Sequence, residues 1–599
     1  MFTLLKNRIK AARFAKLFPA MLALCLSACA QSPESGVDPL DLIPHSPAAS
    51  TDVVKVEFAA GIPQELVLAI VSLQGLVNRV KPVIYTYSPN VNYPDGTQKL
   101  YEKDGYITSV RECGDVMALL NEFSDYYDGV VVYDPAKRYT INLASNIAGA
   151  ETRVILSPAM LEEFRRRVDP GVDVMDIRDL AFPDEHTAFC WYREHVFPKQ
   201  DHRMLGVVKD CYMYDVIRDY LIASNSPTFW LYGENDEGAY PENLDDVVWL
   251  MEHTPVNIPV FGSWIGIEEG REVGYNEYFG TRFGSWYGKY SLPCTWVGGY
   301  SYHSGVQLAD YSFRQTKVRA KKFREYDPEK KYVALVMVDS GDAPAYYVYD
   351  GLFPRQWDDP FRGQVPLSYG LALSMRHIMP GVMRHLYDTA TENDYFFCAV
   401  GGLGYSYSLL GLCDSTSMPE RNYHEYFRLT DANMKALDMD MIMIYTYSGY
   451  EKWSPADSLK VRNHIAAMPN LTSIVSGLHR TGYSPAEGNG FIGDRGVTVH
   501  HVMNHWSDDD DWELFRSGPA GDGPAVDHLE AELRRNAETA DFITTMFYSW
   551  HYGPRRLKQL QDRMEKDGFE FVTLNEYDYL YRQSCKQENR SAATAENQQ

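Results

Sequence analysis

Acidic residues follow several apolar runs in the second half of the chain, each near the point where a buried strand would end. Asp339 and Asp342 follow YVALVMV. Glu451 comes shortly after MIMIYT, and Glu576 follows FEFVTL. Carboxyl groups can protonate a leaving oxygen, attack a carbon atom or activate water. Cleavage of a glycosidic bond needs two of them, one on each side of the bond. The preferred pair is Asp342 with Glu451, and Asp339 and Glu576 come next.

Aromatic and histidine side chains follow the same apolar runs. Tryptophan and tyrosine rings can lie against the flat faces of sugars and still offer a polar group for a hydrogen bond. The chain is rich in such rings, with 13% aromatic residues and 43 tyrosines. The candidates for substrate binding are Tyr405, Tyr407, Trp453, His479, His505, Trp506, Trp550 and His551.

A second kind of chemistry is metal-dependent deacetylation of a polysaccharide. The spacing Asp339-x-x-Asp342 and the run HHVMNH at 500–505 contain residue types that ligate a divalent metal, which then activates water. His501 and His505 are four residues apart, but they lie at a predicted strand end rather than on a helix, so they need not share a face. No metal or other cofactor is therefore assigned, and a divalent metal remains an alternative.

The apolar runs also predict the elements that position these residues. Most of the runs are separated by helical stretches such as PADSLKVRNHIAAM. Eight strands that alternate with helices are typical of a (β/α)8 barrel, whose site lies at the carboxyl ends of the strands. The predicted strands are 332–338, 363–368, 395–400, 441–446, 471–476, 497–503, 542–548 and 569–574.

The remainder of the chain divides around this barrel-like domain, which we place at 326–583. Strand and helix runs alternate from 51 to about 310, which predicts α/β layers with parallel strands. Changes in composition divide this part into three lobes, and the polar tail is predicted to be disordered. The lobes are 51–160, 161–240 and 241–325, and the tail is 584–599.

The first residues resemble a targeting signal. Basic residues precede the short apolar run LFPAMLALCL, which is too short to cross a membrane. The run ends in LSAC, where small residues precede Cys29 as in a bacterial lipoprotein signal. Residues 1–28 are therefore predicted to be a signal peptide, and residues 29–50 a flexible tether. Lipid on Cys29 would anchor an extracytoplasmic protein to a membrane without spanning it.

The net charge and the cysteine content limit the kinds of ligand and metal site that the chain can be expected to have. The formal net charge is −24, which argues against nucleic acid and polyanionic substrates, because phosphate binding requires clustered Lys and Arg. A neutral carbohydrate is compatible with this charge. Beyond Cys25 and Cys29 the chain has an odd number of cysteines and no CxxC pair, so neither a full disulfide framework nor a zinc site is indicated.

The segment AVGGLGYSYS, residues 399–408, directly follows a predicted strand. Its glycines allow a sharp turn and the close approach of a ligand. GGLGYSYS resembles the signature of the GxGYxYP family of secreted bacterial proteins. Gly402, Gly404, Tyr405 and Tyr407 match the signature, and a serine replaces its final proline. SLQGLVNRVKPVIY, RGQVPLSYG and MPGVMRHLYDTATENDYF resemble further blocks of the family, so the resemblance covers most of the chain after the tether.

The resemblance implies small N-terminal α/β lobes before a barrel-like domain, and an association with glycoside hydrolysis. After its first barrel strand the family tends to carry S-D-G-D-N, whereas this chain has DSGDA at 339–343. Gly341 and Asp342 match, the first two residues are exchanged, and Ala343 replaces an amide. A role for Asp342 can be carried over, but one for Ala343 cannot. This departure keeps open a third reading, a non-catalytic glycan-binding lipoprotein.

Overall fold

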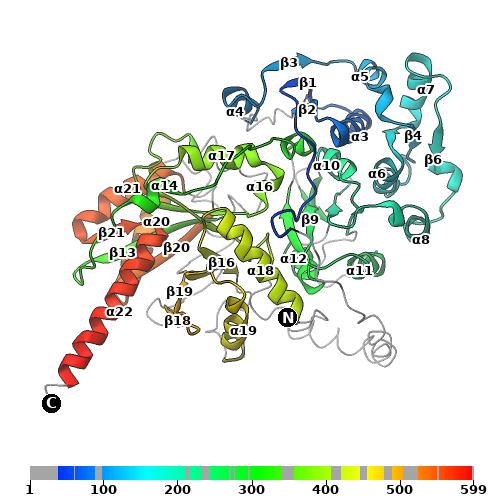
Figure 1. Ribbon diagram of the computed structural model, residues 1–599. Coiled ribbons are helices and arrows are strands. Elements are labelled where there is room, and N and C mark those ends of the chain that lie inside the picture. Colours follow the sequence, from blue (N-terminus) through cyan, green and yellow to red (C-terminus); the bar gives the residue numbers. More distant parts are fainter. Residues whose placement is uncertain are drawn as a thin grey trace, which may run out of the picture.

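The computed structural model is an α/β molecule built from parallel sheets, with the N-terminal lobes on one side and the C-terminal domain on the other (Figure 1). The predicted α/β class is thereby confirmed. Within the described part of the chain, no helix has the length and apolar character that a membrane span requires. The structure describes residues 38–59, 61–87, 97–209, 215–231, 243–268, 271–274, 277–294, 297–338, 356–406, 420–445, 455–477, 489–502, 524–548 and 552–596.

Among the described residues, the N-terminal half contains three small parallel sheets and one antiparallel pair, β10 (Ile265–Glu268) with β11 (Arg271–Gly274). The first has the order β2-β1-β3, with β1 (Asp52–Glu57), β2 (Ile84–Tyr87) and β3 (Ser109–Glu112). The second has the order β5-β4-β6, with β4 (Gly129–Val132), β5 (Arg153–Leu156) and β6 (Val174–Asp176). The third has the order β12-β9-β7-β8, with β7 (Leu205–Val207), β8 (Thr228–Phe229), β9 (Pro259–Gly262) and β12 (Tyr290–Pro293). The lobe boundaries at 160 and 240 stay a prediction.

Helix α3 (Gln64–Val80) is the centre of this half. Its sequence is apolar on almost every side, and the run Val67–Asn78 is buried throughout. Such a helix must be covered all round rather than on one stripe. Helix α10 (Arg218–Ala223) packs against it at Gly75, where a Cβ atom would lie 2.5 Å from the Asp219 carbonyl oxygen. The glycine therefore sets the distance between the two helices.

The C-terminal domain contains one nine-stranded sheet with the order β18-β19-β17-β16-β15-β14-β13-β20, in which β21 also pairs with β13. All eight predicted strands exist, and the antiparallel edge strand β18 is an addition. The strands are β13 (Lys331–Val338), β14 (Leu367–Leu371), β15 (Asp394–Cys398), β16 (Met441–Tyr445), β17 (Ser473–Gly477), β18 (Gly490–Ile492), β19 (Val497–His501), β20 (Phe542–Tyr548) and β21 (Phe569–Val572).

A regular (β/α)8 barrel is not confirmed. Strand β21 pairs with β13 only over Lys331–Ala334, and β14 pairs with the same strand further along, at Val336 and Met337. The eighth strand therefore shares β13 with the second strand instead of standing between β20 and β13. The two distant strands β19 and β20 meet through one parallel bridge, between Val502 and Thr544.

The sheet curves around a small apolar core. This inner core combines residues from strands at both ends of the sheet, so one face of the sheet is concave. Helix α22 (Leu574–Glu596) begins inside it, because Leu574, Tyr577 and Leu580 belong to the same cluster. The helix continues far beyond residue 584 and projects from the domain (Figure 1), so the predicted disorder of the tail is replaced by helix up to Glu596.

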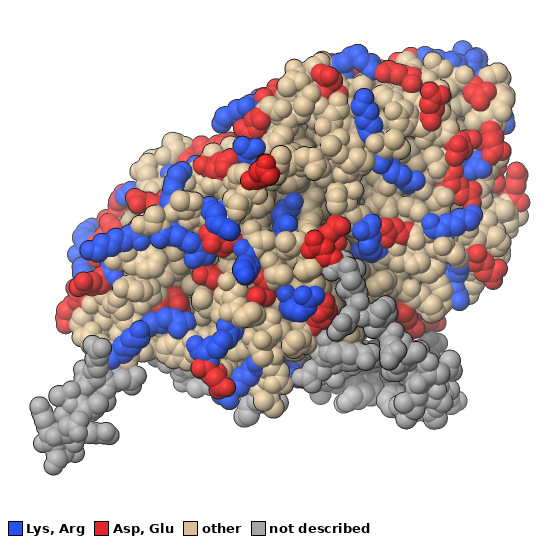
Figure 2. Space-filling model, viewed as in Figure 1, with Lys and Arg blue, Asp and Glu red and all other residues tan. Residues whose placement is uncertain are grey.

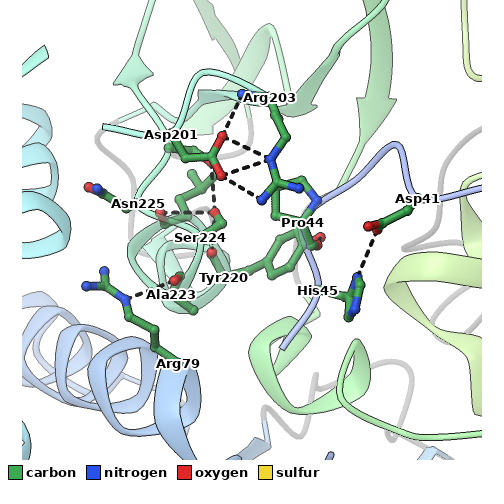
Figure 3. Close-up of polar contacts among 12 residues, drawn as sticks. Asp41, Pro44, His45, Arg79, Asp201, Arg203, Tyr220, Ala223, Ser224 and Asn225 are labelled. Carbon is green, nitrogen blue, oxygen red and sulfur yellow. Dashed lines mark hydrogen bonds and ion pairs between the residues drawn. The ribbon is translucent and has the colours of Figure 1, made fainter. Parts of the chain in front are cut away.

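Residues 38–50, which we expected to be part of a flexible tether, form a packed strap. Ile43 is only 1% exposed. The Tyr220 hydroxyl of α10 donates a hydrogen bond to the Pro44 carbonyl oxygen, as Figure 3 shows. On the other side, Asn433 of helix α18 (Glu420–Ala436) donates to the Pro39 carbonyl oxygen at 2.9 Å. The strap therefore touches both the N-terminal half and the C-terminal domain.

The charges are mixed over the surface. On the face that Figure 2 shows, Lys and Arg are interspersed with Asp and Glu over the described residues. The excess of acidic residues is therefore not gathered into one patch on this face, as a polycation-binding surface would require.

Candidate functional site

Two of the predicted catalytic and substrate-binding residues, Tyr405 and Glu576, are described by the structure. The others lie outside the described residues, as does Cys29, and their roles stay predictions. They are Asp339, Asp342, Tyr407, Glu451, Trp453, His479, His505, Trp506, Trp550 and His551. The site is therefore built from the strand ends that precede them and from the signature segment.

The signature turns sharply at the carboxyl end of β15. Gly401 and Gly402 have φ angles of 81° and 127°, a region that residues with a Cβ atom rarely adopt. The Tyr426 hydroxyl of α18 donates to the Gly401 carbonyl oxygen at 3.1 Å and also contacts the Ser406 hydroxyl at 3.0 Å. Gly401 and the first signature glycine, Gly402, therefore allow a turn that α18 holds in place.

The third signature glycine serves a different purpose. Tyr405 pairs with Ser291 of β12 through two backbone hydrogen bonds, of 2.8 Å and 3.0 Å. A Cβ atom on Gly404 would lie 2.6 Å from the Tyr290 ring and 2.8 Å from the Ser291 carbonyl oxygen. Gly404 therefore permits the C-terminal domain to dock on a strand of the N-terminal half. Sequence reasoning missed Ser291, because its contribution is made by the backbone.

Tyr405 lies at the carboxyl end of the curved sheet. It is 3% exposed and belongs to the inner core together with Val338, Ala399 and Val400. Val338 is the last residue of β13, so Tyr405 shares this core with the strand end after which Asp339 and Asp342 follow in the sequence. A tyrosine here can present an apolar ring on one side and a hydroxyl on the other.

The two histidines His500 and His501 do not act together. Successive residues of a strand point to opposite faces. The His500 ring packs on Tyr577 in the inner core, and its Nε2 atom is 2.9 Å from Asp578 Oδ1. His501 points to the other face. Among the described residues no group of three His, Cys, Asp or Glu side chains is placed to hold a metal ion.

Asp578 is an ion-pair partner inside the domain. Burial alone would raise the pKa of its carboxyl group, but the hydrogen bond from His500 and the charge of Arg582 outweigh burial and hold that pKa below its ordinary value. Arg582 also donates to the carbonyl oxygens of Gly496 and Thr472, which directly precede β19 and β17. Asp578 therefore lies at the amino ends of the strands, away from the site edge.

Glu576 lies at that same amino end. Its carboxylate pairs with Lys321 at 3.3 Å and accepts a hydrogen bond from the Arg324 backbone N–H at 3.0 Å. Lys321 in turn donates to Asn393, the residue before β15. Tyr405 comes after the carboxyl end of β15, so the structure does not bring Glu576 and Tyr405 together. This placement gives Glu576 the role of a structural anchor rather than the predicted catalytic role.

Comparisons with known proteins show similarity in sequence and in fold. Residues 329–582 match the model of the family described as GxGYxYP putative glycoside hydrolase C-terminal domain. The C-terminal domain is a GxGYxYP domain. The resemblance of the signature is thereby confirmed over this part of the chain, while the domain bounds 326–583 stay a prediction.

Solved structures extend the similarity over the N-terminal half. The crystal structure of a putative hydrolase from Bacteroides thetaiotaomicron VPI-5482 superimposes with a TM-score of 0.66 and 16% identity, covering 91% of this chain and 98% of its own. At this identity the similarity shows the fold alone. A peptidoglycan deacetylase from Bacillus subtilis matches 44% of this chain and 98% of its own at 11% identity, with a TM-score of 0.22 that carries no argument. No curated protein matches the sequence.

Proposed function

We propose that the GxGYxYP domain hydrolyses glycosidic bonds of a neutral carbohydrate. The observation that carries this proposal is the match of residues 329–582 to a family of glycoside hydrolase type. Two further observations support it. The domain has a curved parallel sheet, the kind of scaffold that gathers side chains at the carboxyl ends of its strands. The surplus of acidic residues in the chain also favours an uncharged substrate.

The chemistry is assigned to carboxyl groups that follow the strands in the sequence. Asp342 follows β13 and serves as acid or nucleophile, and Glu451 follows β16 as its partner. Asp339 is the reserve candidate, because Glu576 is held in ion pairs at the amino end of the strands. One carboxyl group protonates the leaving oxygen, while the other attacks the anomeric carbon or activates water.

Substrate contacts come from rings at the same edge. Tyr405 is held in place by the backbone pairing with Ser291, so the N-terminal half takes part in positioning a residue of the site. Tyr407 and Trp453 are the further candidates for stacking on a sugar ring. The complete chain, rather than the GxGYxYP domain alone, is therefore the catalytic unit that we propose.

The location of the protein belongs to the same proposal. The basic residues, the apolar run and the LSAC sequence favour a signal that ends before Cys29, with lipid on its sulfur. A lipid anchor would hold the enzyme at a membrane outside the cytoplasm. Metabolic labelling with an alkynyl fatty acid tests whether Cys29 carries lipid. We expect label on the natural chain and no label on Cys29→Ser.

The function is tested by mass spectrometry on a panel of neutral glycans. The chain from residue 30 onward is incubated with the panel beside Asp342→Asn, Glu451→Gln and Glu570→Gln. We expect shortened glycans with the unmodified chain and a rate about a hundredfold lower for Asp342→Asn and Glu451→Gln. Glu570 is a partly exposed residue that pairs with Lys330 and Arg324 at the amino end of the strands, so Glu570→Gln should retain the rate and serves as the control.

Other outcomes would redirect the proposal. Full activity of Asp342→Asn on a glycan that the chain cleaves would remove Asp342 from the mechanism. Glycans that keep their length but lose acetyl groups would establish a deacetylase. Glycans that come back unchanged but bind in a calorimetric titration would establish a binding protein, as the DSGDA sequence at 339–343 allows.

A further inference from the structure

A thiol, an imidazole and a carboxylate meet on the surface of the N-terminal half, outside the GxGYxYP domain. His186 and Cys190 lie on helix α8 (Glu185–His195), and their spacing of four residues puts them on one face. His186 Nε2 is 3.6 Å from Cys190 Sγ. His186 Nδ1 is 2.8 Å from Oδ1 of Asp246, which lies on helix α11 (Leu244–Glu252). The three groups therefore form a continuous chain of hydrogen bonds.

The order of the contacts has a chemical meaning. When Nδ1–H of His186 donates to Asp246, the lone pair of Nε2 faces the Cys190 thiol. This is the arrangement of nucleophile, base and orienting carboxylate that activates nucleophiles in hydrolases of unrelated folds. The His186 side chain is 68% exposed, whereas that of Asp246 is 10% exposed. The orienting carboxylate of Asp246 is thus buried in the protein, whereas the imidazole of His186, which faces the thiol, is open to solvent.

Charged groups surround the imidazole. Burial raises the pKa of the Asp246 carboxyl group, and the hydrogen bond from the imidazole opposes that rise. Asp184 and Glu185 lie at the start of α8, and Asp245 precedes Asp246 on α11. Arg193, one α8 turn beyond Cys190, is the cation near Asp246.

We propose that Cys190 is a thiol-modification site that takes disulfides of small thiols. Cys190 Sγ attacks one sulfur of the disulfide while its proton moves to His186 Nε2. A new S–S bond to Cys190 forms, the S–S bond of the reagent breaks, and the leaving thiolate takes the proton. Cys190 is oxidised to a mixed disulfide, and half of the reagent is reduced to a thiol. The inference does not depend on the proposed glycosidase.

A sulfur electrophile suits this site better than an acyl group. Acyl transfer develops a charged oxygen that needs backbone N–H donors beside the nucleophile. The N–H groups around Cys190 belong to the middle of α8, where they are used within the helix. Disulfide exchange develops charge only on sulfur, so the three side chains are sufficient.

The test is the rate of mixed-disulfide formation with the neutral reagent dithiodipyridine, followed for each cysteine by peptide mass spectrometry on the complete chain. Cys113 is the internal reference, because it is also partly exposed but its sulfur donates to the Asp115 carbonyl oxygen instead of facing an imidazole. At pH 7 we expect Cys190 to react about tenfold faster than Cys113. His186→Gln should bring the two rates to within about twofold of each other, and Asp246→Asn should give an intermediate rate.

The control is His195→Gln, the same substitution on the same helix. His195 stacks on Trp191 and binds its carbonyl oxygen, so its removal should leave the Cys190 rate unchanged. The buried Cys294 reports on folding, because it reacts only if a variant has opened. Equal rates for Cys190 and Cys113 would overturn the proposal. Equal effects of His186→Gln and His195→Gln, with Cys294 still unreactive, would overturn it as well.

Discussion

Ser291 of strand β12 and Tyr405 of the signature are hydrogen-bonded backbone to backbone in both directions, although Ser291 lies in a sheet of the N-terminal half and Tyr405 follows strand β15 of the C-terminal domain. This pairing makes the signature a joint between the two halves of the molecule. Tyr405, which we propose as a substrate contact, is therefore held by the N-terminal half as well as by its own domain.

Replacing Gly404 by alanine should open this joint. The added Cβ atom would lie 2.6 Å from the Tyr290 ring and 2.8 Å from the Ser291 carbonyl oxygen, so the strands must separate. We expect the free energy of unfolding to fall by about 1–3 kcal/mol in urea titrations. Gly114→Ala is the matched control, since a Cβ atom there meets nothing within 4 Å. Equal stability of the two variants would contradict the close approach.

If Glu576 is a structural anchor, its replacement should lower the stability of the protein and leave its catalytic activity intact. Glu576→Gln removes a fully buried charge that pairs with Lys321, so the free energy of unfolding should fall by about 1–3 kcal/mol. Glu570→Gln, on a partly exposed pair with Lys330, should cost less than about 1 kcal/mol. Once a substrate is known, a collapse of turnover in Glu576→Gln with an unchanged melting temperature would restore its catalytic role.

Asp219 should make stability depend on pH. Burial raises the pKa of its carboxyl group to about 6, while the unfolded chain has the ordinary value. Between pH 4 and 6 the folded state therefore holds a proton that the unfolded state has lost, so the contribution of Asp219 to stability is present at low pH and disappears as pH rises through 6. The free energy of unfolding of Asp219→Asn, relative to that of the unmodified chain, should therefore rise by about 3 kcal/mol between pH 4 and pH 7.

This comparison is made by urea unfolding at a series of pH values. The amide oxygen of Asn can still accept the hydrogen bonds that Asp219 receives from the Ser301 backbone and hydroxyl. Asp52→Asn on the surface serves as the control. A difference between Asp219→Asn and the unmodified chain that stays constant with pH would show that this carboxyl group does not titrate in the range.

The strap should contribute to global stability. Ile43 is buried between the two halves, so Ile43→Ala is expected to lower the free energy of unfolding by about 2–4 kcal/mol. His45→Ala removes a neighbouring exposed side chain that pairs with Asp41 on the surface, and it should cost less than about 1 kcal/mol. A freely moving tether would instead give two variants with the same melting curve as the unmodified chain.

The sequence predicted the strands well because most C-terminal strands are rich in buried apolar residues, as is typical of buried parallel strands. The sequence analysis placed Glu576 at the carboxyl edge of the sheet, because it assumed that every strand ends at that edge. Strand β21 pairs only with Lys331–Ala334, so it ends several residues before β13 does. The residues after it therefore enter the core instead of reaching the carboxyl edge.

The two ends of the chain were misjudged for a compositional reason. The proline- and serine-rich segment before residue 50 contains Leu42 and Ile43, which were sufficient to bind it to the surface. The tail after residue 584 is polar but contains no glycine or proline, and its Gln, Lys, Glu and Ala residues favour helix. The pairing of Ser291 with Tyr405 leaves no such trace, because backbone bonds between distant segments do not depend on side-chain type.

The position of helix α22 decides how a long substrate could move. Leu574, Tyr577 and Leu580 fill the amino end of the curved sheet, and the Tyr577 ring packs on Phe542 and His500. Among the described residues, side chains of α22 therefore close this end of the sheet. If the proposed glycosidase acts on a long glycan, that glycan should approach from the carboxyl ends of the strands and not through the amino end.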